Sequence, residues 1–285
     1  MYYFLLFVII IAVGVQSIFR KEFNIKTDGA QSAPYVFNLL AAAAAVIFLM
    51  FFGLADYTFH LPTLIYSLFF GAMFEVAVVT ILYALMYGSL SLTSLLLSYS
   101  IILPAIYGIL FLGEPFRITT AVGLLLLVVS LYLFNKKNET LKITKKWLFY
   151  ITLLFISNGA CSIIMKVHAV KYPDMYQTEF LGTAMLFVAL INAVILIFVK
   201  KGGIGNAFRR GCYLAAPNGI CNVGANLLLM MLSSAIPASI VFPVVAAGGI
   251  VTAYVISRFM YKEKMSAIQN IAFIISLISI TVLNL

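Results

Sequence analysis

Charged residues are scarce in this sequence. They make up 9% of its 285 residues, whereas hydrophobic residues make up 64%, against roughly 25% and 45–50% in soluble domains. The mean hydropathy is +1.11, so water cannot be the main solvent of the folded chain. A helix that crosses a bilayer needs about 20 largely apolar residues, and about ten crossings would use nearly the whole length. The composition therefore excludes a soluble globular protein and leaves no room for a separate soluble domain.

The sequence also lacks the alternation of apolar and polar residues that a membrane-spanning strand requires. Its apolar runs are long and continuous. Backbone groups in lipid must be satisfied inside helices or a closed barrel, so the runs predict helices. We expect an all-α integral membrane protein with ten transmembrane helices. The expected spans are 2–19, 35–54, 62–86, 89–112, 118–134, 147–170, 178–199, 211–233, 236–260 and 266–285.

Metal ligands and nucleophiles are few. The three cysteines, Cys161, Cys212 and Cys221, are too scattered for a disulfide or zinc framework. The only histidines, His60 and His168, have no cysteine or carboxylate nearby at a metal-ligand spacing. No glycine-rich stretch has the spacing of a phosphate-binding loop. We therefore expect no metal, no cofactor, no catalytic residues and no ATP hydrolysis. An intramembrane enzyme or lipid-handling protein remains a minor alternative.

The two halves of the chain resemble one another. Ser17-Ile18-Phe19-Arg20-Lys21 ends the first span and Ser162-Ile163-Ile164-Met165-Lys166 lies in the sixth, 145 positions later. Phe111-Leu112-Gly113-Glu114 and Met260-Tyr261-Lys262-Glu263 end the fourth and ninth spans, 149 positions apart. These offsets predict a five-helix repeat over 1–135, a basic cytoplasmic connection over 136–146 and a second repeat over 147–285. Five is an odd number of crossings, so the second repeat must be inverted, as in many secondary transporters.

Basic residues predict the orientation in the membrane. The formal net charge is +9, but the basic residues lie in short connections and not along one face, which argues against nucleic acid binding. Connections 1–2, 5–6, 7–8 and 9–10 hold 15 Lys and Arg residues, and only Arg117, Lys166 and Lys171 fall on the other side. The positive-inside rule then places both termini outside a cell (inner) membrane.

The fourth span carries a family resemblance. The segment that contains this span runs from Ala84-Leu85-Met86-Tyr87-Gly88-Ser89 to Leu110-Phe111-Leu112-Gly113-Glu114. Together with ten helices in two repeats, it resembles the EamA-like branch of the drug/metabolite transporter superfamily over the full chain. The resemblance implies a central cavity surrounded by the first, third, fourth, sixth, eighth and ninth helices, opened alternately to each side. Members of this superfamily move amino acids, choline, nucleotide sugars, sugar phosphates, cations or drugs.

Glu75 is the first candidate site residue. It is the only acidic residue that the expected spans place near a membrane centre, where an ionisable group costs roughly 2.5–3.5 kcal/mol on insertion scales. Burial disfavours the charged carboxylate, so this group could hold a proton or a cationic substrate. The alternative is a structural carboxyl group that bonds a neighbouring helix.

A polar stripe on the eighth span is the second candidate. Asn218, Asn222 and Asn226 recur every fourth residue and share one helix face. They could bind substrate or could join helices by hydrogen bonds.

Weaker candidates complete the set. They are Asn158, Gln16, Ser94, Ser98, Tyr99 and Tyr83. The serines could instead permit close helix packing, and aromatic walls could bind a quaternary ammonium by cation–π attraction. Lys21 and Lys166 stand near matched helix ends, where anion binding is a minor possibility.

These features together predict a secondary active transporter of a small polar metabolite in the lipid bilayer. The expected substrate is cationic or zwitterionic, such as an amine, a choline-like compound or an amino acid. Transport is expected to be coupled to protons or to proceed by exchange. The alternative within transport is drug efflux of lipophilic cations.

Overall fold

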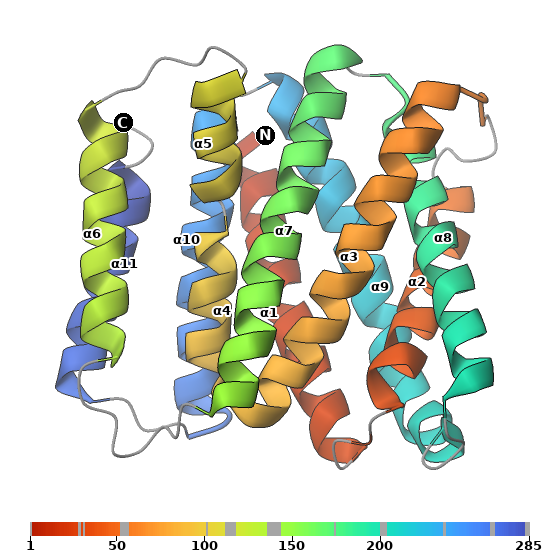
Figure 1. Cartoon of the computed structure of the whole chain (residues 1–285), viewed down its shortest axis with the longest axis horizontal. Helices are drawn as coiled ribbons and strands as arrows, with labels where there is room; N and C mark the ends of the chain where they lie inside the picture. The colour runs from red at the N-terminus through yellow and green to blue at the C-terminus, as the bar shows by residue number, and fades with distance from the viewer. Residues whose placement is uncertain are drawn as a thin grey trace.

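Helices form all of the regular structure in the described part of the computed structural model (Figure 1). The structure describes residues 2–27, 30, 32–51, 57–100, 102–111, 118–135, 144–173, 175–199, 204–235, 238–262 and 266–282. The helices are α1 (Tyr2–Lys26), α2 (Ala33–Phe51), α3 (Leu61–Tyr87), α4 (Leu90–Tyr99), α5 (Ile102–Phe111), α6 (Ile118–Asn135), α7 (Lys145–Lys171), α8 (Gln177–Phe198), α9 (Ile204–Ala235), α10 (Ala238–Phe259) and α11 (Ala267–Val282).

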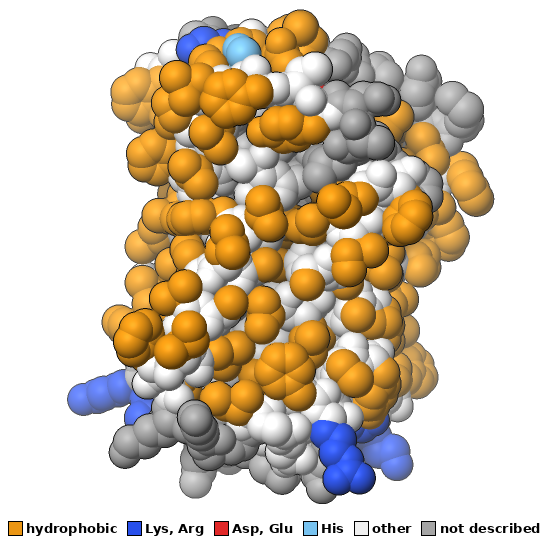
Figure 2. Space-filling view, turned by 90° about the vertical axis from the view of Figure 1, so that its right-hand side faces the viewer, with side chains coloured by type: hydrophobic (Ala, Val, Ile, Leu, Met, Phe, Trp, Pro, Cys, Tyr) orange, Lys and Arg blue, Asp and Glu red, His pale blue; other side chains and the backbone are white. Residues whose placement is uncertain are grey.

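Six of these helices are long and apolar enough to cross a membrane. They are α1, α2, α3, α7, α8 and the 211–232 part of α9. The outer surface fits a lipid environment, because large hydrophobic side chains such as Phe51 and Phe198 are more than four-fifths exposed. Figure 2 shows hydrophobic side chains across the middle of one face, with Lys and Arg side chains near its two ends. The expected class, an all-α membrane protein, is confirmed.

The expected span 89–112 is divided into two helices. α4 begins after Ser89, whose hydroxyl accepts a hydrogen bond from the Leu92 N–H, and it ends at Tyr99. α5 then starts at Ile102. Pro104 explains the division, because it has no N–H to donate to the Ser100 carbonyl four residues earlier.

The expected end of the first span at residue 19 was wrong. α1 continues to Lys26, and its last turns are packed inside the protein. Phe23 is fully buried, and the Asn24 side chain donates a 2.9 Å hydrogen bond to the Leu82 carbonyl on α3. Tertiary contacts therefore keep this segment helical, and Arg20 belongs to a helix and not to a connection.

The bundle is built from neighbouring helix pairs that are distant in sequence. α3 packs on α7, α1 packs on α9, and α2 packs on both α8 and α9. α6 and α11 form a separate pair at one edge (Figure 1), joined to the rest mainly through α10. The largest buried apolar cluster joins α2, α3, α4, α7 and α9, and it also includes Phe23 of α1 and Ala272 of α11. The repeat-ending residues Glu114 and Glu263 and most of the expected connection 136–146 lie outside the described residues.

Candidate functional site

A pocket with polar walls lies between five helices of the bundle. It contains about 300 Å³ of space between atoms, part of it open to solvent, and α1, α2, α3, α8 and α9 contribute its walls. Its polar lining residues are Arg20, Asn38, Asn218 and Asn222, and the others are Ala41, Ala42, Phe74, Val78, Met185, Val188 and Gly219. Polar groups from helices of both halves of the chain therefore converge on one space.

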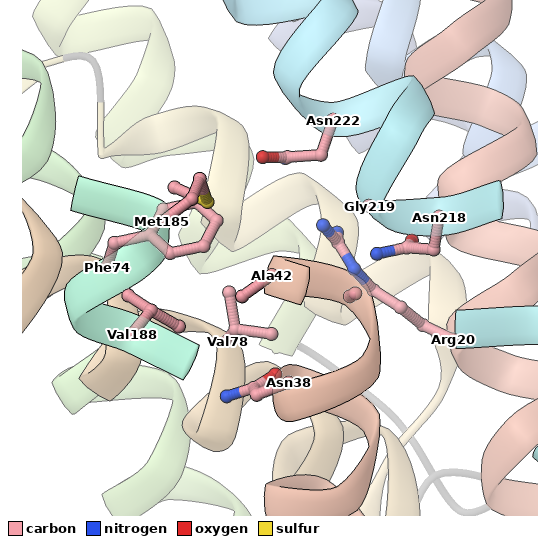
Figure 3. Close-up of a pocket in the computed structure, with 11 residues that line it drawn as sticks. Arg20, Asn38, Ala42, Phe74, Val78, Met185, Val188, Asn218, Gly219 and Asn222 are labelled. Atoms are coloured by element: carbon pink, nitrogen blue, oxygen red, sulfur yellow. The ribbon is translucent and has the colours of Figure 1, made fainter. Parts of the chain in front are cut away.

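Arg20 supplies the charge in this pocket. Figure 3 shows its guanidinium projecting from α1 beside Asn218, with Asn222 and Asn38 on either side. One Nη atom donates a 3.1 Å hydrogen bond to Oε1 of Gln16, one turn earlier on α1. The Nε atom is buried and has no hydrogen-bond partner in the described structure. The guanidinium therefore faces the pocket with donor capacity left over.

Glu75 lies just behind the pocket wall. The residue is 7% exposed, and its Oε2 accepts hydrogen bonds from the side chains of Asn192 at 2.6 Å and Asn38 at 3.1 Å. Since Asn38 also lines the pocket, one amide connects the carboxylate to the cavity. Oε1 of Glu75 is buried and has no partner among the described residues. The carboxylate thus joins α3 to α2 and α8 and keeps one oxygen uncommitted.

The asparagine stripe of α9 faces α1. The Asn222 side chain donates a 3.0 Å hydrogen bond to the same Gln16 oxygen that Arg20 contacts. Asn218 lines the pocket and is 3% exposed, and its Oδ1 has no partner in the described part of the chain. Asn226 bonds Asn222 on its own helix and does not line the pocket. The stripe therefore combines helix joining with pocket lining.

A glycine next to these amides brings two backbones together. A Cβ atom at Gly219 would lie 1.9 Å from the Ala41 carbonyl oxygen of α2. No L side chain fits in that space, so the close approach of α9 to α2 depends on glycine. This contact holds Asn218 and Asn222 opposite Asn38.

Of the weaker candidates, Gln16 contacts the pocket residues Arg20 and Asn222, whereas the others do not line the pocket and bond residues elsewhere. Asn158 donates a 2.6 Å hydrogen bond to the Ser100 hydroxyl, and the Ser98 hydroxyl bonds the Ser94 carbonyl one turn earlier. The Tyr99 ring is fully buried, and its hydroxyl shares a 2.8 Å hydrogen bond with Ser130 of α6.

Tyr83 contacts another aromatic residue. Its ring stacks on Tyr150 of α7 with 4.9 Å between the ring centroids. Tyr83 does not line the pocket.

Three residues of the site were missed from the sequence. Arg20 was assigned to a connection, because basic residues near the end of an apolar run usually set orientation. Asn38 and Asn192 were passed over, although each is a single carboxamide within an apolar run. The α9 stripe was chosen because its amides recur every fourth residue, whereas Asn38 and Asn192 are marked only by their polarity within an apolar run.

The described residues of the site offer hydrogen bonds and charge. No group of three His, Cys, Asp or Glu side chains suited to a metal occurs among the described residues. A guanidinium, several amides and a carboxyl group behind one of them are suited to binding a small polar solute.

Comparison with known proteins gives information about the fold alone. No protein-family model matches the sequence, and no curated protein matches it. Among solved structures, 28 chains match. One is a crystal structure described only as that of a protein, with a TM-score of 0.62 and 15% sequence identity. The match covers 98% of this chain and 94% of that chain, so the two share an overall fold along nearly their full lengths.

Proposed function

We propose that this protein is a secondary active transporter of a small polar metabolite, an EamA-like member of the drug/metabolite transporter superfamily. The substrate is cationic or zwitterionic, and transport is coupled to protons or proceeds by exchange through alternating access. In this proposal the chain crosses the membrane ten times, with α4 and α5 forming the fourth crossing, as two inverted five-helix repeats with both termini outside.

The packing of the helices supports the inverted repeat. An exchange of the two halves pairs α1 with α7, α2 with α8 and α3 with α9. Under this exchange the α3 contact with α7 becomes the α9 contact with α1, and the α2 contact with α9 becomes the α8 contact with α3. All four contacts are present. The contacts of α2 with α8 and of α6 with α11 map onto themselves.

Two hydrogen bonds at the edge of the bundle support the same symmetry. The Ser130 hydroxyl of α6 donates to the Ala272 carbonyl of α11 at 2.8 Å. The Ser279 hydroxyl of α11 donates to the Gly123 carbonyl of α6 at 2.6 Å. The donors are 149 positions apart in sequence, and so are the acceptors. This is the offset that separates the repeat-ending residues Glu114 and Glu263.

The polar pocket inside an apolar bundle is the observation that carries the proposal. Ionisable and amide side chains are costly within a membrane, and they commonly mark the path of a substrate or ion. Here Arg20 and Asn38 of the first half meet Asn218 and Asn222 of the second half around one space. Transporters with inverted repeats place their site at such an interface.

Glu75 is the group proposed to bind the coupling proton. Its carboxyl group is buried against Asn38 and Asn192, and one of its oxygens has no partner in the described structure. A proton on that oxygen would remove the charge without disturbing the two hydrogen bonds at the other oxygen.

Transport by the purified protein in proteoliposomes tests the proposal. Radiolabelled amines, amino acids, sugars and nucleotides would be offered with and without a proton gradient. We expect one class to accumulate, or to exchange with internal solute, above protein-free liposomes. A transport function would be rejected if no solute class entered the liposomes and none raised the melting temperature of the protein.

A matched pair of variants links the transport to the pocket. Asn222→Leu removes a pocket amide and its bond to Gln16, and we expect transport to fall by about tenfold, the effect of one such hydrogen bond. Thr152→Val is the control, because Thr152 is exposed on α7 and bonds only its own helix. Equal transport activity of the two variants would show that the pocket amide does not contribute to transport.

A further inference from the structure

Arg20 is a cation inside the bundle without a described counter-charge. Of the nine acidic residues in the sequence, Glu22, Glu75 and Glu179 lie in the described structure, and none forms an ion pair with Arg20 there. Glu22 contacts the Tyr261 hydroxyl, and Glu179 contacts Thr58 and Thr178. A cation held away from water is stable only with compensation.

The direction of the Arg20 side chain excludes the usual way of lowering this cost. Arginines near helix ends normally extend their heads toward the membrane surface. Here the guanidinium turns into the pocket (Figure 3), where its Nε is buried. The position therefore suits a cation whose partner arrives with a ligand.

We propose that Arg20 binds a carboxylate group of the transported solute, a substrate class that rests on the transport function proposed above. The guanidinium fork matches a carboxylate in shape and charge and can donate two parallel hydrogen bonds. Nε and one Nη form such an edge, and Nε has no other partner in the described part of the chain. The Asn218 side chain lies beside the guanidinium in the same pocket.

The charge of the pocket favours a carboxylate over a phosphate. A single guanidinium neutralises one negative charge, and no lysine or second arginine lines the described pocket. A phosphate group carries about −1.5 to −2 charges near pH 7, so part of its charge would remain uncompensated. Glu75, behind the wall at Asn38, adds to this disadvantage whenever it is ionised.

Asn38, on the wall of the pocket across from Arg20, determines which carboxylates bind best. The Asn38 amide nitrogen donates to Glu75, so its oxygen is turned away from the carboxylate. That oxygen is buried and has no partner among the described residues. It is an acceptor for an ammonium group, which a zwitterion has and a simple carboxylic acid lacks. The zwitterion and the simple carboxylate share the Arg20 contact and differ at Asn38.

Binding to the purified protein tests the proposal with solutes that share a carbon skeleton. One set is alanine, propionate and ethylamine, and a second is leucine, 4-methylpentanoate and isopentylamine, with inorganic phosphate added. We expect alanine or leucine to bind, whether or not the carboxylate with the same carbon skeleton also binds. We expect ethylamine, isopentylamine and phosphate not to bind. Binding of the zwitterions alone would make Asn38 part of the site. Binding of the amines at least as tightly as the carboxylates, or of phosphate alone, would overturn the proposal.

Variants assign this binding to Arg20. We expect Arg20→Gln to weaken carboxylate binding by about tenfold to hundredfold, since a charge-assisted hydrogen bond is lost. Arg20→Lys should be intermediate, because it keeps the charge and loses the fork. Arg209→Gln is the control, because it removes the same charge from an exposed position on α9. Unchanged carboxylate affinity in Arg20→Gln would overturn the assignment.

A measurement on the unaltered protein covers the case in which the variants fail to fold. Phenylglyoxal modifies arginine side chains, and mass spectrometry of peptides reports Arg20 and Arg209 separately. At ten times its Kd, a carboxylate should slow modification of Arg20 roughly tenfold and leave Arg209 unchanged. Equal rates at Arg20 with and without every tested carboxylate would also overturn the proposal.

The two proposals fail in different ways. If the proteoliposomes move amines and no carboxylate protects Arg20, the transport function stands and the substrate class is wrong. If a carboxylate protects Arg20 and no solute is transported, the binding site stands and the transport function is wrong.

Discussion

The Asn192 amide of α8 donates a 2.6 Å hydrogen bond to Glu75 of α3, so a buried carboxyl group joins the two halves of the chain. Both residues are buried, and the Asn192 amide also bonds the Val188 carbonyl of its own helix. The contact is polar, short and shielded from solvent, which makes its energy measurable by substitution.

A double-mutant cycle measures this contact. We expect Asn192→Leu to destabilise the fold, because Glu75 then retains only Asn38 as a partner. Glu75→Leu should also destabilise it, and the two effects should be coupled by about 1–3 kcal/mol. Unfolding by a denaturing detergent would supply the free energies. Strictly additive effects would show that the two side chains do not interact in the membrane.

Substitution of the carboxyl group tests its proposed role in coupling. Glu75→Gln keeps the size of the side chain and an oxygen for both amide donors, so we expect it to fold. It cannot take up or release a proton, so accumulation driven by a proton gradient should fall by about tenfold or more and lose its pH dependence, while solute exchange persists. The assay is uptake into proteoliposomes at several pH values.

Glu179→Gln is the matched control for this substitution. Glu179 lies in the first turn of α8 and bonds Thr58 and Thr178, so its loss should leave accumulation unchanged. Normal driven uptake with normal pH dependence in Glu75→Gln would make the carboxyl group merely structural.

The close contact of α9 with α2 predicts a large difference between two glycines. Gly219→Ala would bring a methyl group within 1.9 Å of the Ala41 carbonyl oxygen, whereas a Cβ at Gly224 has no atom within 4 Å. We expect Gly219→Ala to lower the melting temperature and the yield of folded protein strongly. Gly224→Ala should be neutral or slightly stabilising, because alanine favours helix over glycine by about 1 kcal/mol. Similar melting temperatures for both variants would contradict the close contact.

The distribution of basic residues predicts the orientation of the chain. Arg20, Lys21 and Lys26 all lie in α1 and not in a connection. Without these three, 12 of the 15 basic residues counted on the cytoplasmic side remain, against three on the other side. We therefore expect alkaline phosphatase fused to either terminus to be active outside the membrane, and fluorescent protein fusions there to be dark. The opposite pattern at the C-terminus would invert the whole assignment.

The fold class was readable from the sequence because composition and apolar run length depend on the solvent around the protein. The helix boundaries were harder to predict from the sequence. α1 was expected to end where Arg20 and Lys21 interrupt the apolar run, but Phe23 and Asn24 pack against other helices and keep the chain helical. Hydropathy measures preference for lipid, and it does not register a polar turn that other helices surround.

Only part of the candidate site could be predicted from the sequence. Glu75, Asn218 and Asn222 were chosen because polar groups in apolar runs need partners, and the structure places all three at the pocket or directly behind its wall. Tyr99 was expected near the cavity, but its hydroxyl bonds Ser130 at the far edge. The direction of a side chain depends on the rotation of its helix about the helix axis, and this rotation could not be predicted from one sequence.

The backbone contact between Gly219 and Ala41 has a mechanical consequence. Small residues at a helix contact let two backbones approach closely, so this point fixes the separation of α9 and α2. Asn218 and Asn222 lie within one turn of it, so a change in the crossing angle of the two helices would displace these amides less than it displaces the ends of α9. The contact therefore keeps the pocket amides near Asn38 even when the ends of the helix move.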